Sequence, residues 1–148
     1  MRKVIFATIM LAGLWMTAAC DKEEVNGDVP EAVARPTDWV VSQDLNPTTE
    51  QAVVVKSEGL PTEIDKNDLL AAFVNGDCTD VSAPILDDDG AYFALVVMAP
   101  GAAEGNHQVE LRYYSAKAQR IYYADPFVLC PGERLGSLTG SGYAPRWR

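Results

Sequence analysis

Residues 69–78 read LLAAFVNGDC, and this stretch decides the fold. By periodicity alone, its six leading apolar residues fit a buried strand as well as a helix. The Asn75-Gly76 pair that follows favours strands, because a type I′ hairpin turn needs a positive φ at both of its central residues. The stretch therefore predicts two antiparallel strands, at 69–74 and 77–86, joined by a tight turn.

Short apolar runs separated by turn residues occur on both sides of this hairpin. β-branched runs lie at 39–41 and 52–55, with a loop signal at 46–49 between them. The run 91–98 is apolar on both of its faces. It predicts a central strand that is covered on both sides or lies beside a small-residue contact.

The last two expected strands alternate between apolar and polar residues. In 107–115 we expect Val109, Leu111 and Tyr113 to point inward and Tyr114 outward. In 119–129 the residues expected inward are Ile121, Tyr123, Phe127 and Leu129, and those expected outward are Tyr122 and Val128. Together the runs predict an all-β fold, an antiparallel β-sandwich of about seven or eight strands, with a Gly- and Ser-rich tail from Gly132.

Four short motifs resemble a known kind of module. They are LAAFVNGDC at 70–78, the strand at 90–97, LRYY at 111–114 and LGS at 135–137. Over residues 48–145 the chain resembles the small, uncharacterised β-sandwich modules (L-A-A-F-V-x-G-x-C type) of Bacteroidota secreted and surface proteins. It departs from them at Thr79-Asp80, where the family usually has Arg-Gly. The resemblance implies a surface β-sandwich and assigns no catalytic residue.

The N-terminus predicts export and lipid anchoring. The basic start Arg2-Lys3 precedes an apolar run at 4–16, which is too short to span a bilayer and suits a signal peptide at 1–19. The stretch Thr17-Ala18-Ala19-Cys20 resembles a bacterial lipoprotein box, except that the family usually has Leu in place of Thr17. The resemblance implies lipid attachment to Cys20; ordinary secretory cleavage is the alternative.

The residues after Cys20 predict a tether and its location. Asp21-Lys22-Glu23-Glu24 resembles the signal of surface-exposed Bacteroidota lipoproteins, which implies the outer face of an outer membrane. The periplasmic face is the alternative. Residues 20–36 are acidic, punctuated by proline and free of aromatic residues, so we expect a flexible, disordered tether. The β-sandwich domain is then expected at 37–148.

The charge of the mature chain disfavours nucleic acid as a partner. Loss of Arg2 and Lys3 with the signal peptide leaves 10 of the 12 basic residues against 21 acidic ones, a net charge of −11. A surface of that sign repels a phosphate backbone. The remaining length suits one domain with its own core.

Cys78 and Cys130 are the two cysteines left if Cys20 carries lipid. In an oxidising compartment they are a possible disulfide, which would stabilise the fold by roughly 4 kcal/mol in the chain-entropy model. The alternative is two free thiols that pack like small apolar side chains.

Catalytic and metal-binding patterns are missing from the sequence. His107 is the only histidine, and there is no G-x-S-x-G, H-E-x-x-H or paired C-x-x-C motif. We therefore expect no enzyme, no metal and no cofactor. The run Asp87-Asp88-Asp89-Gly90 fits an acidic hairpin turn better than a calcium loop, in which ligands alternate with spacers.

Tyr114 and Tyr122 are expected to face the same outward side of the sandwich. With Trp39 they form a possible ligand platform on which sugar rings could stack; the alternative is cross-strand packing without a ligand. These features predict a membrane-anchored, non-enzymatic binding module with carbohydrate as the candidate ligand. The alternative is a structural or assembly subunit of a surface complex or adhesin, which docks on a protein partner through an edge strand.

Overall fold

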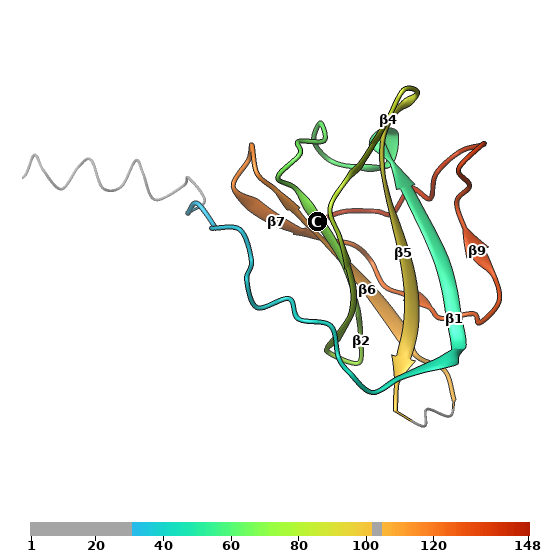
Figure 1. Cartoon of the computed structure of the whole chain (residues 1–148). Coiled ribbons are helices and arrows are strands. Elements are labelled where there is room, and N and C mark those ends of the chain that lie inside the picture. The colour runs from blue at the N-terminus through green and yellow to red at the C-terminus, as the bar shows by residue number, and fades with distance from the viewer. Residues whose placement is uncertain (1–30, 102–104) are drawn as a thin grey trace, which may run out of the picture. The chain divides into compact units, whose positions relative to one another are not determined.

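The protein is described by a computed structural model that covers residues 31–101 and 105–148. Cys20, the expected signal peptide and most of the expected tether lie outside the described residues. The chain divides into two units, 1–32 and 33–148. Of the first unit, only Glu31 and Ala32 are described, and both are exposed and irregular. In the second unit two β-sheets face each other (Figure 1).

Sheet A has the strand order β4-β5-β1-β9, and sheet B has the order β3-β2-β6-β7, with β8 beside β6. Neighbouring strands are antiparallel except for β1 and β9, which are parallel. The bounds are β1 Leu45–Lys56, β2 Leu69–Val74, β3 Asp77–Ser82, β4 Ile85–Asp87, β5 Gly90–Pro100, β6 Gln108–Ser115, β7 Arg120–Tyr123, β8 Phe127–Val128 and β9 Arg134–Leu135, with a 3-10 turn at Ser57–Gly59. The expected all-β sandwich is confirmed, with nine strands among the described residues.

The hairpin that decides the fold forms as expected. β2 pairs with β3, and the turn residues Asn75 and Gly76 have φ values of 54° and 89°. The expected strand 77–86 is interrupted, however, at Ala83-Pro84. Proline has no N–H to donate to a ladder, so β3 ends before it and β4 joins sheet A instead. The run 39–41 also forms no strand.

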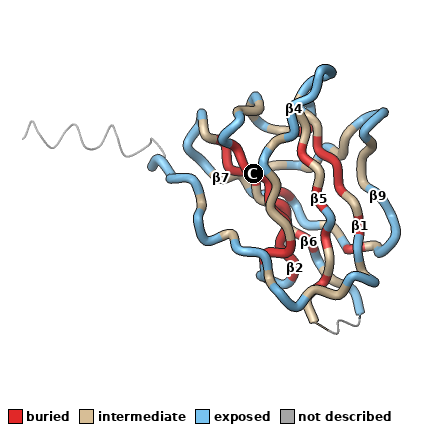
Figure 2. Tube along the Cα trace, viewed as in Figure 1, coloured by how far each residue is buried: buried red, intermediate tan, exposed pale blue. Residues whose placement is uncertain are grey.

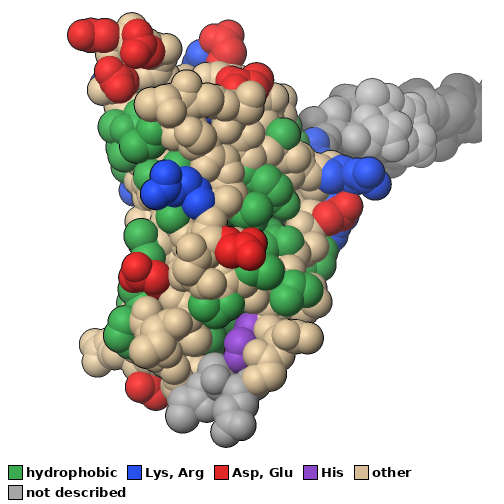
Figure 3. Space-filling view, turned by 90° about the vertical axis from the view of Figure 1, so that its right-hand side faces the viewer, with side chains coloured by type: hydrophobic (Ala, Val, Ile, Leu, Met, Phe, Trp, Pro, Cys, Tyr) green, Lys and Arg blue, Asp and Glu red, His purple; other side chains and the backbone are tan. Residues whose placement is uncertain are grey.

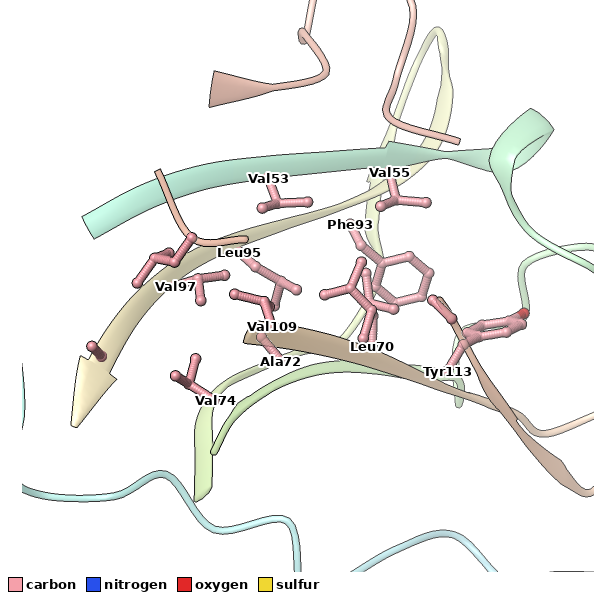
Figure 4. Close-up of a cluster of buried hydrophobic side chains, with 14 residues drawn as sticks. Val53, Val55, Leu70, Ala72, Val74, Phe93, Leu95, Val97, Val109 and Tyr113 are labelled. Carbon is pink, nitrogen blue, oxygen red and sulfur yellow. The ribbon is translucent and has the colours of Figure 1, made fainter. Parts of the chain in front are cut away.

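The core fills the space between the two sheets (Figures 2 and 4). Val53 and Val55 of β1 and Phe93 of β5 are fully buried from the sheet A side. Leu111 and Tyr113 of β6 are fully buried from the sheet B side, in the alternation that the sequence predicts. The inner faces of both sheets therefore meet in one apolar layer.

The register of β7 differs by one residue from the expectation. Tyr122 lies opposite Tyr113, and the two rings stack with centroids 6.0 Å apart, so Tyr122 points inward. Tyr123 is outward and 36% exposed. The Ala116–Gln119 turn sets this register, with Gln119 at a positive φ of 51°. A shift of one residue moves every side chain of a strand to the opposite face.

The C-terminal segment, residues 132–148, is part of the sandwich rather than a tail. Tyr143 N–H donates to the Val54 carbonyl at 2.7 Å, along the outer edge of β1. A Cβ on Gly142 would lie only 2.7 Å from Lys56 N, so this close approach requires glycine. Trp147 packs against the core, and its indole N–H donates to the Gly59 carbonyl at 2.7 Å.

One carboxylate connects the two sheets at the corner where β3 lies beside β5. Asp80 Oδ2 accepts a hydrogen bond of 2.8 Å from Val96 N–H of β5, while Oδ1 accepts one from Val81 N–H. β4 pairs with β5 only as far as Tyr92, so it does not reach Val96. Asp80 therefore supplies the hydrogen-bond acceptor for the Val96 N–H.

A second carboxylate, Asp68, is fully buried at the start of β2. It accepts hydrogen bonds from the Tyr113 hydroxyl at 2.6 Å, Ala116 N–H at 2.7 Å and Asp65 N–H at 2.8 Å. Burial and the neighbouring Asp68 carboxylate raise the pKa of the Tyr113 hydroxyl well above its ordinary value. The network joins the loop before β2 to the end of β6.

The outer face of sheet B is crossed by residues 33–44. Val33 N–H donates to the Gln119 carbonyl in the β6–β7 turn at 2.8 Å, and Ser42 N–H donates to the Cys78 carbonyl at 2.9 Å. Between these two points, the Trp39 ring packs edge-on against Phe73, with centroids 5.8 Å apart. The chain thus enters this unit at the β6–β7 turn.

Candidate functional site

The two cysteines of the sandwich are free thiols, which corrects the possible disulfide. Cys78 is buried on β3, where it packs with Ala71 and Phe73 on the outer face of sheet B. Cys130 lies beside β1, and its N–H donates to Gln51 Oε1 at 3.0 Å. Cys78 thus lies on sheet B, whereas Cys130 lies outside the strands, between β8 and β9. Burial raises the pKa of the Cys78 thiol, which makes it a poor nucleophile.

The expected aromatic platform does not form. Tyr114 lies on the outer face of sheet B and is only 4% exposed, because residues 33–44 cross this face. Tyr122 lies on the opposite, inner face of the same sheet. Trp39 is half-buried against Phe73. Since Tyr114 and Tyr122 are on opposite faces, no single ligand can stack on both rings.

The outer face of sheet A is the open apolar surface of the described sandwich. Ala52 of β1 and Ala94 and Val96 of β5 point outward here, and Val96 is 42% exposed. The sequence predicts that the strand at 91–98 is covered on both sides or lies beside small residues. In the structure its inner face is buried, and its outer face lies beside the small side chain of Ala52.

Three neighbouring hollows lie on this side, and we refer to them together as the sheet A groove. They have volumes of about 410, 210 and 80 Å³. The first and second share Ala52 and Arg134, and the second and third share Leu138. The groove follows β1 from Glu50 to Lys56, a distance of about 20 Å at the usual rise of a strand.

The floor and the ends of the groove differ in chemistry. The middle is apolar and shallow, over Ala52, Ala94 and Val96. Charged side chains lie towards its two ends: Glu50, Glu133 and Arg134 at one, and Lys56, Asp87, Asp89 and the ring of Tyr92 at the other. An apolar floor between hydrogen-bonding groups suits an elongated ligand that has both apolar and polar surfaces.

One wall of the groove is held in place by Lys56. Its ammonium donates to the Leu138 carbonyl at 2.9 Å and to the Gly140 carbonyl at 2.6 Å. The loop closes on itself through a hydrogen bond from Ser137 N–H to the Ser141 carbonyl at 3.0 Å. Leu138 is 58% exposed at the crest of this wall. The wall is therefore positioned before any ligand binds.

The lining of the groove contains carboxylates, two cations and a tyrosine, but no histidine, serine or cysteine. His107 lies elsewhere, with Nδ1 3.1 Å from the side-chain amide of Asn75. Across the part of the chain that the structure describes, no group of three or more His, Cys, Asp or Glu side chains is placed to hold a metal ion.

The sequence did not predict this site, because the expected ligand platform lay at Tyr114, Tyr122 and Trp39. It did predict that the strand at 91–98 is apolar on both faces, and Tyr92, Ala94 and Val96 of that strand line the groove. Arg134 and Leu138 were missed, since they lie in a segment that reads as a Gly- and Ser-rich tail. The neighbouring LGS motif at 135–137 is the signal that could have found them.

Within residues 31–101 and 105–148, no helix is long and apolar enough to cross a membrane. Comparison with known proteins finds no matching family model, no matching curated protein and no matching solved structure.

Proposed function

We propose that the protein is a membrane-anchored surface lipoprotein whose β-sandwich is a non-enzymatic binding module, and that its sheet A groove takes an extended carbohydrate chain. The observation that carries this proposal is the succession of three hollows with shared lining residues along an open sheet face. The groove replaces the platform of Tyr114 and Tyr122 as the place where a ligand can be held.

The shape and lining of the groove support a carbohydrate. A sugar ring has apolar C–H faces and hydroxyl groups around its rim. The apolar floor at Ala94 and Val96 suits the faces, and the carboxylates of Asp87 and Asp89 can accept hydrogen bonds from the hydroxyls. The ring of Tyr92 adds an aromatic surface at one end. A groove of about 20 Å suits several linked sugars rather than one.

The lipid anchor is supported by the sequence around Cys20 and by the charge of the chain. Acyl chains on Cys20 would insert into a bilayer and contribute about 0.8 kcal/mol for each buried CH₂ group. A net charge of −11 keeps the sandwich soluble on its tether. Mass spectrometry of the native protein tests this part, because an unmodified Cys20 would remove the anchor.

Affinity gel electrophoresis tests the groove. The mature chain with Cys20→Ser is run through gels that contain one soluble polysaccharide each, and retardation reports binding. Tyr92→Ala should abolish the retardation. The matched control is Tyr123→Ala, which removes an exposed tyrosine from the outer face of sheet B. If no polysaccharide retards the chain, or if both variants lose retardation equally, the groove is not a carbohydrate site.

The second candidate function is assembly with a protein partner. Ile85, Val96 and Leu138 are each more than 40% exposed on or beside the same face, and exposed apolar groups of this kind occur at protein interfaces. Pull-down from detergent-solubilised membranes tests this reading. A stoichiometric protein partner that is lost in Ile85→Lys and unaffected by added sugar would favour assembly over carbohydrate binding.

A further inference from the structure

Basic side chains gather along one edge of the sandwich, although the mature chain is strongly acidic. The members of this basic edge are Arg112, Lys117, Arg120, Arg146 and Arg148, which lie on β6, β7, the turn between them and the C-terminal segment. Figure 3 shows basic side chains at the right-hand margin of the molecule, with an acidic side chain beside them, and a group of acidic side chains at the upper left. Among the described residues this is the main concentration of positive charge.

Strand pairing builds the edge. Tyr123 and Arg148 exchange backbone hydrogen bonds of 3.0 and 2.8 Å, and Asp125 N–H donates to the Arg146 carbonyl at 2.9 Å. The C-terminal residues thus form an added strand beside β7. Arg146 and Arg148 are two residues apart, so they project to the same side of this strand.

Arg112 is neutralised by Glu110 at 2.8 Å, and Glu110 also lies 3.7 Å from Arg148, but the other ion pairs of the edge are weak. Arg146 and Arg148 lie 3.9 and 3.6 Å from the Asp125 carboxylate, and their side chains are 86% and 60% exposed. Lys117 lies 3.8 Å from Glu63 and is 57% exposed. Exposed ion pairs at such distances contribute little, so these cations remain available to another anion.

The charge balance of the edge is positive. Five side-chain cations face three side-chain carboxylates, Glu63, Glu110 and Asp125. The opposite side of the sandwich has the other sign, since the sheet A groove contains Glu50, Glu133, Asp87 and Asp89 against Arg134 and Lys56.

The tether enters the sandwich beside this edge. Val33, the first residue of the unit, donates its N–H to Gln119, which lies between Lys117 and Arg120 in the sequence. Cys20 precedes Val33 by 13 residues. A chain of that length spans at most about 45 Å when fully extended. A lipid on Cys20 would therefore keep the basic edge within reach of the bilayer surface.

We propose that the basic edge contacts the headgroups of anionic lipids and so orients the sandwich on its membrane; this inference rests on the lipid anchor of the proposed function. Each Lys or Arg at an anionic surface strengthens association about fivefold. The tether keeps the basic edge at a high effective concentration near the membrane, so even a weak contact with lipid headgroups is populated. The acidic groove then faces away from the membrane, where a ligand can reach it.

Chemical footprinting of the vesicle-bound protein tests the inference. The mature chain is placed on vesicles of phosphatidylcholine, with or without phosphatidylglycerol, through its own lipid. If Cys20 proves unmodified, an N-terminal hexahistidine tag on a nickel-chelating lipid replaces the anchor. An arginine-specific reagent is then added, and mass spectrometry measures the modification rate of each arginine. Arg134, which is exposed in the groove, is the internal control.

With phosphatidylglycerol present, modification of Arg120 and Arg146 should slow at least about fivefold, and high salt should remove the protection. The rate at Arg134 should not change. In a chain with both Arg120→Gln and Arg146→Gln, the protection of Arg148 should disappear, whereas Arg134→Gln should leave it intact.

Three results would overturn the inference. They are equal rates on the two kinds of vesicle, equal protection of Arg134, and protection by soluble glycerol phosphate as strong as that by vesicles. The last result would mean a phosphate site rather than a membrane surface. Failure of the anchor is seen separately in the mass of the N-terminal peptide, and failure of the groove is seen in the affinity gels.

Discussion

Asp68→Ala should be among the most damaging single changes in the sandwich. The Asp68 carboxylate is fully buried and accepts hydrogen bonds from Tyr113, Ala116 and Asp65. Removing it leaves the half-buried N–H groups of Asp65 and Ala116 without this acceptor, and each unmet donor costs about 1–3 kcal/mol. The Tyr113 hydroxyl keeps Thr62 Oγ1 at 2.9 Å as a partner. Because relief from burying a charge offsets part of the loss, we expect a net loss of about 3 kcal/mol, from a total stability of about 5–15 kcal/mol for a domain of this kind.

Urea unfolding followed by tryptophan fluorescence measures this loss as a lower midpoint with an unchanged slope. Asp68→Asn keeps one carbonyl oxygen and should lose about half as much. The matched control is Glu63→Ala, because Glu63 is a carboxylate of the same loop that is 84% exposed and should change stability by less than about 0.5 kcal/mol. If Asp68→Ala costs no more than Glu63→Ala, the network does not hold the loop to β6.

Three further changes test other contacts. The pKa of Tyr113 is raised in the folded state, so the free energy of unfolding should not depend on this group below about pH 10. Above that pH it should fall by about 1.4 kcal/mol per pH unit. In an alkaline unfolding series, Tyr113→Phe should make this fall shallower. Trp147→Phe removes the indole donor and should cost about 1–2 kcal/mol by urea unfolding, against about 3 for Trp147→Ala. A Trp147→Phe variant as stable as the wild type would show that the hydrogen bond to Gly59 contributes nothing. Asp80→Asn should speed hydrogen exchange at the Val96 amide, and an unchanged rate would show that the carboxylate does not protect it.

Features set by neighbouring residues could be predicted from the sequence. The turn at Asn75-Gly76 depends on two residues that tolerate a positive φ, and it forms where the pair occurs. The buried face of β6 follows from strict alternation, and Leu111 and Tyr113 are fully buried. In both cases the physical cause lies within the stretch itself.

The register of β7 could not be read from its own residues. Ile121, Tyr122 and Tyr123 are all apolar enough to point inward, so alternation does not choose between the two faces. The choice is made by the backbone of the preceding turn, where Gln119 adopts a positive φ that its residue type does not announce. The expected platform failed for this reason, because it needed Tyr122 on the outer face.

The groove could not be predicted because its wall comes from far along the chain. Leu138 is held by Lys56, which is 82 residues earlier. Nothing in the local composition of a Gly- and Ser-rich segment indicates that it lies along a strand. Its glycines permit close backbone approach to β1, as at Gly142, and that role appears only once β1 is in place.

The position of Trp147 has a consequence for how the protein is made. Its contact with Gly59 joins residues 88 positions apart, and the outer edge of β1 is completed by residues that follow Cys130. Such a topology makes folding slow, because long loops must close before native contacts form. Until residues 132–148 have been synthesised, the outer edge of β1 and the contact of Trp147 with Gly59 cannot form, so the sandwich cannot complete its folding on the earlier residues alone.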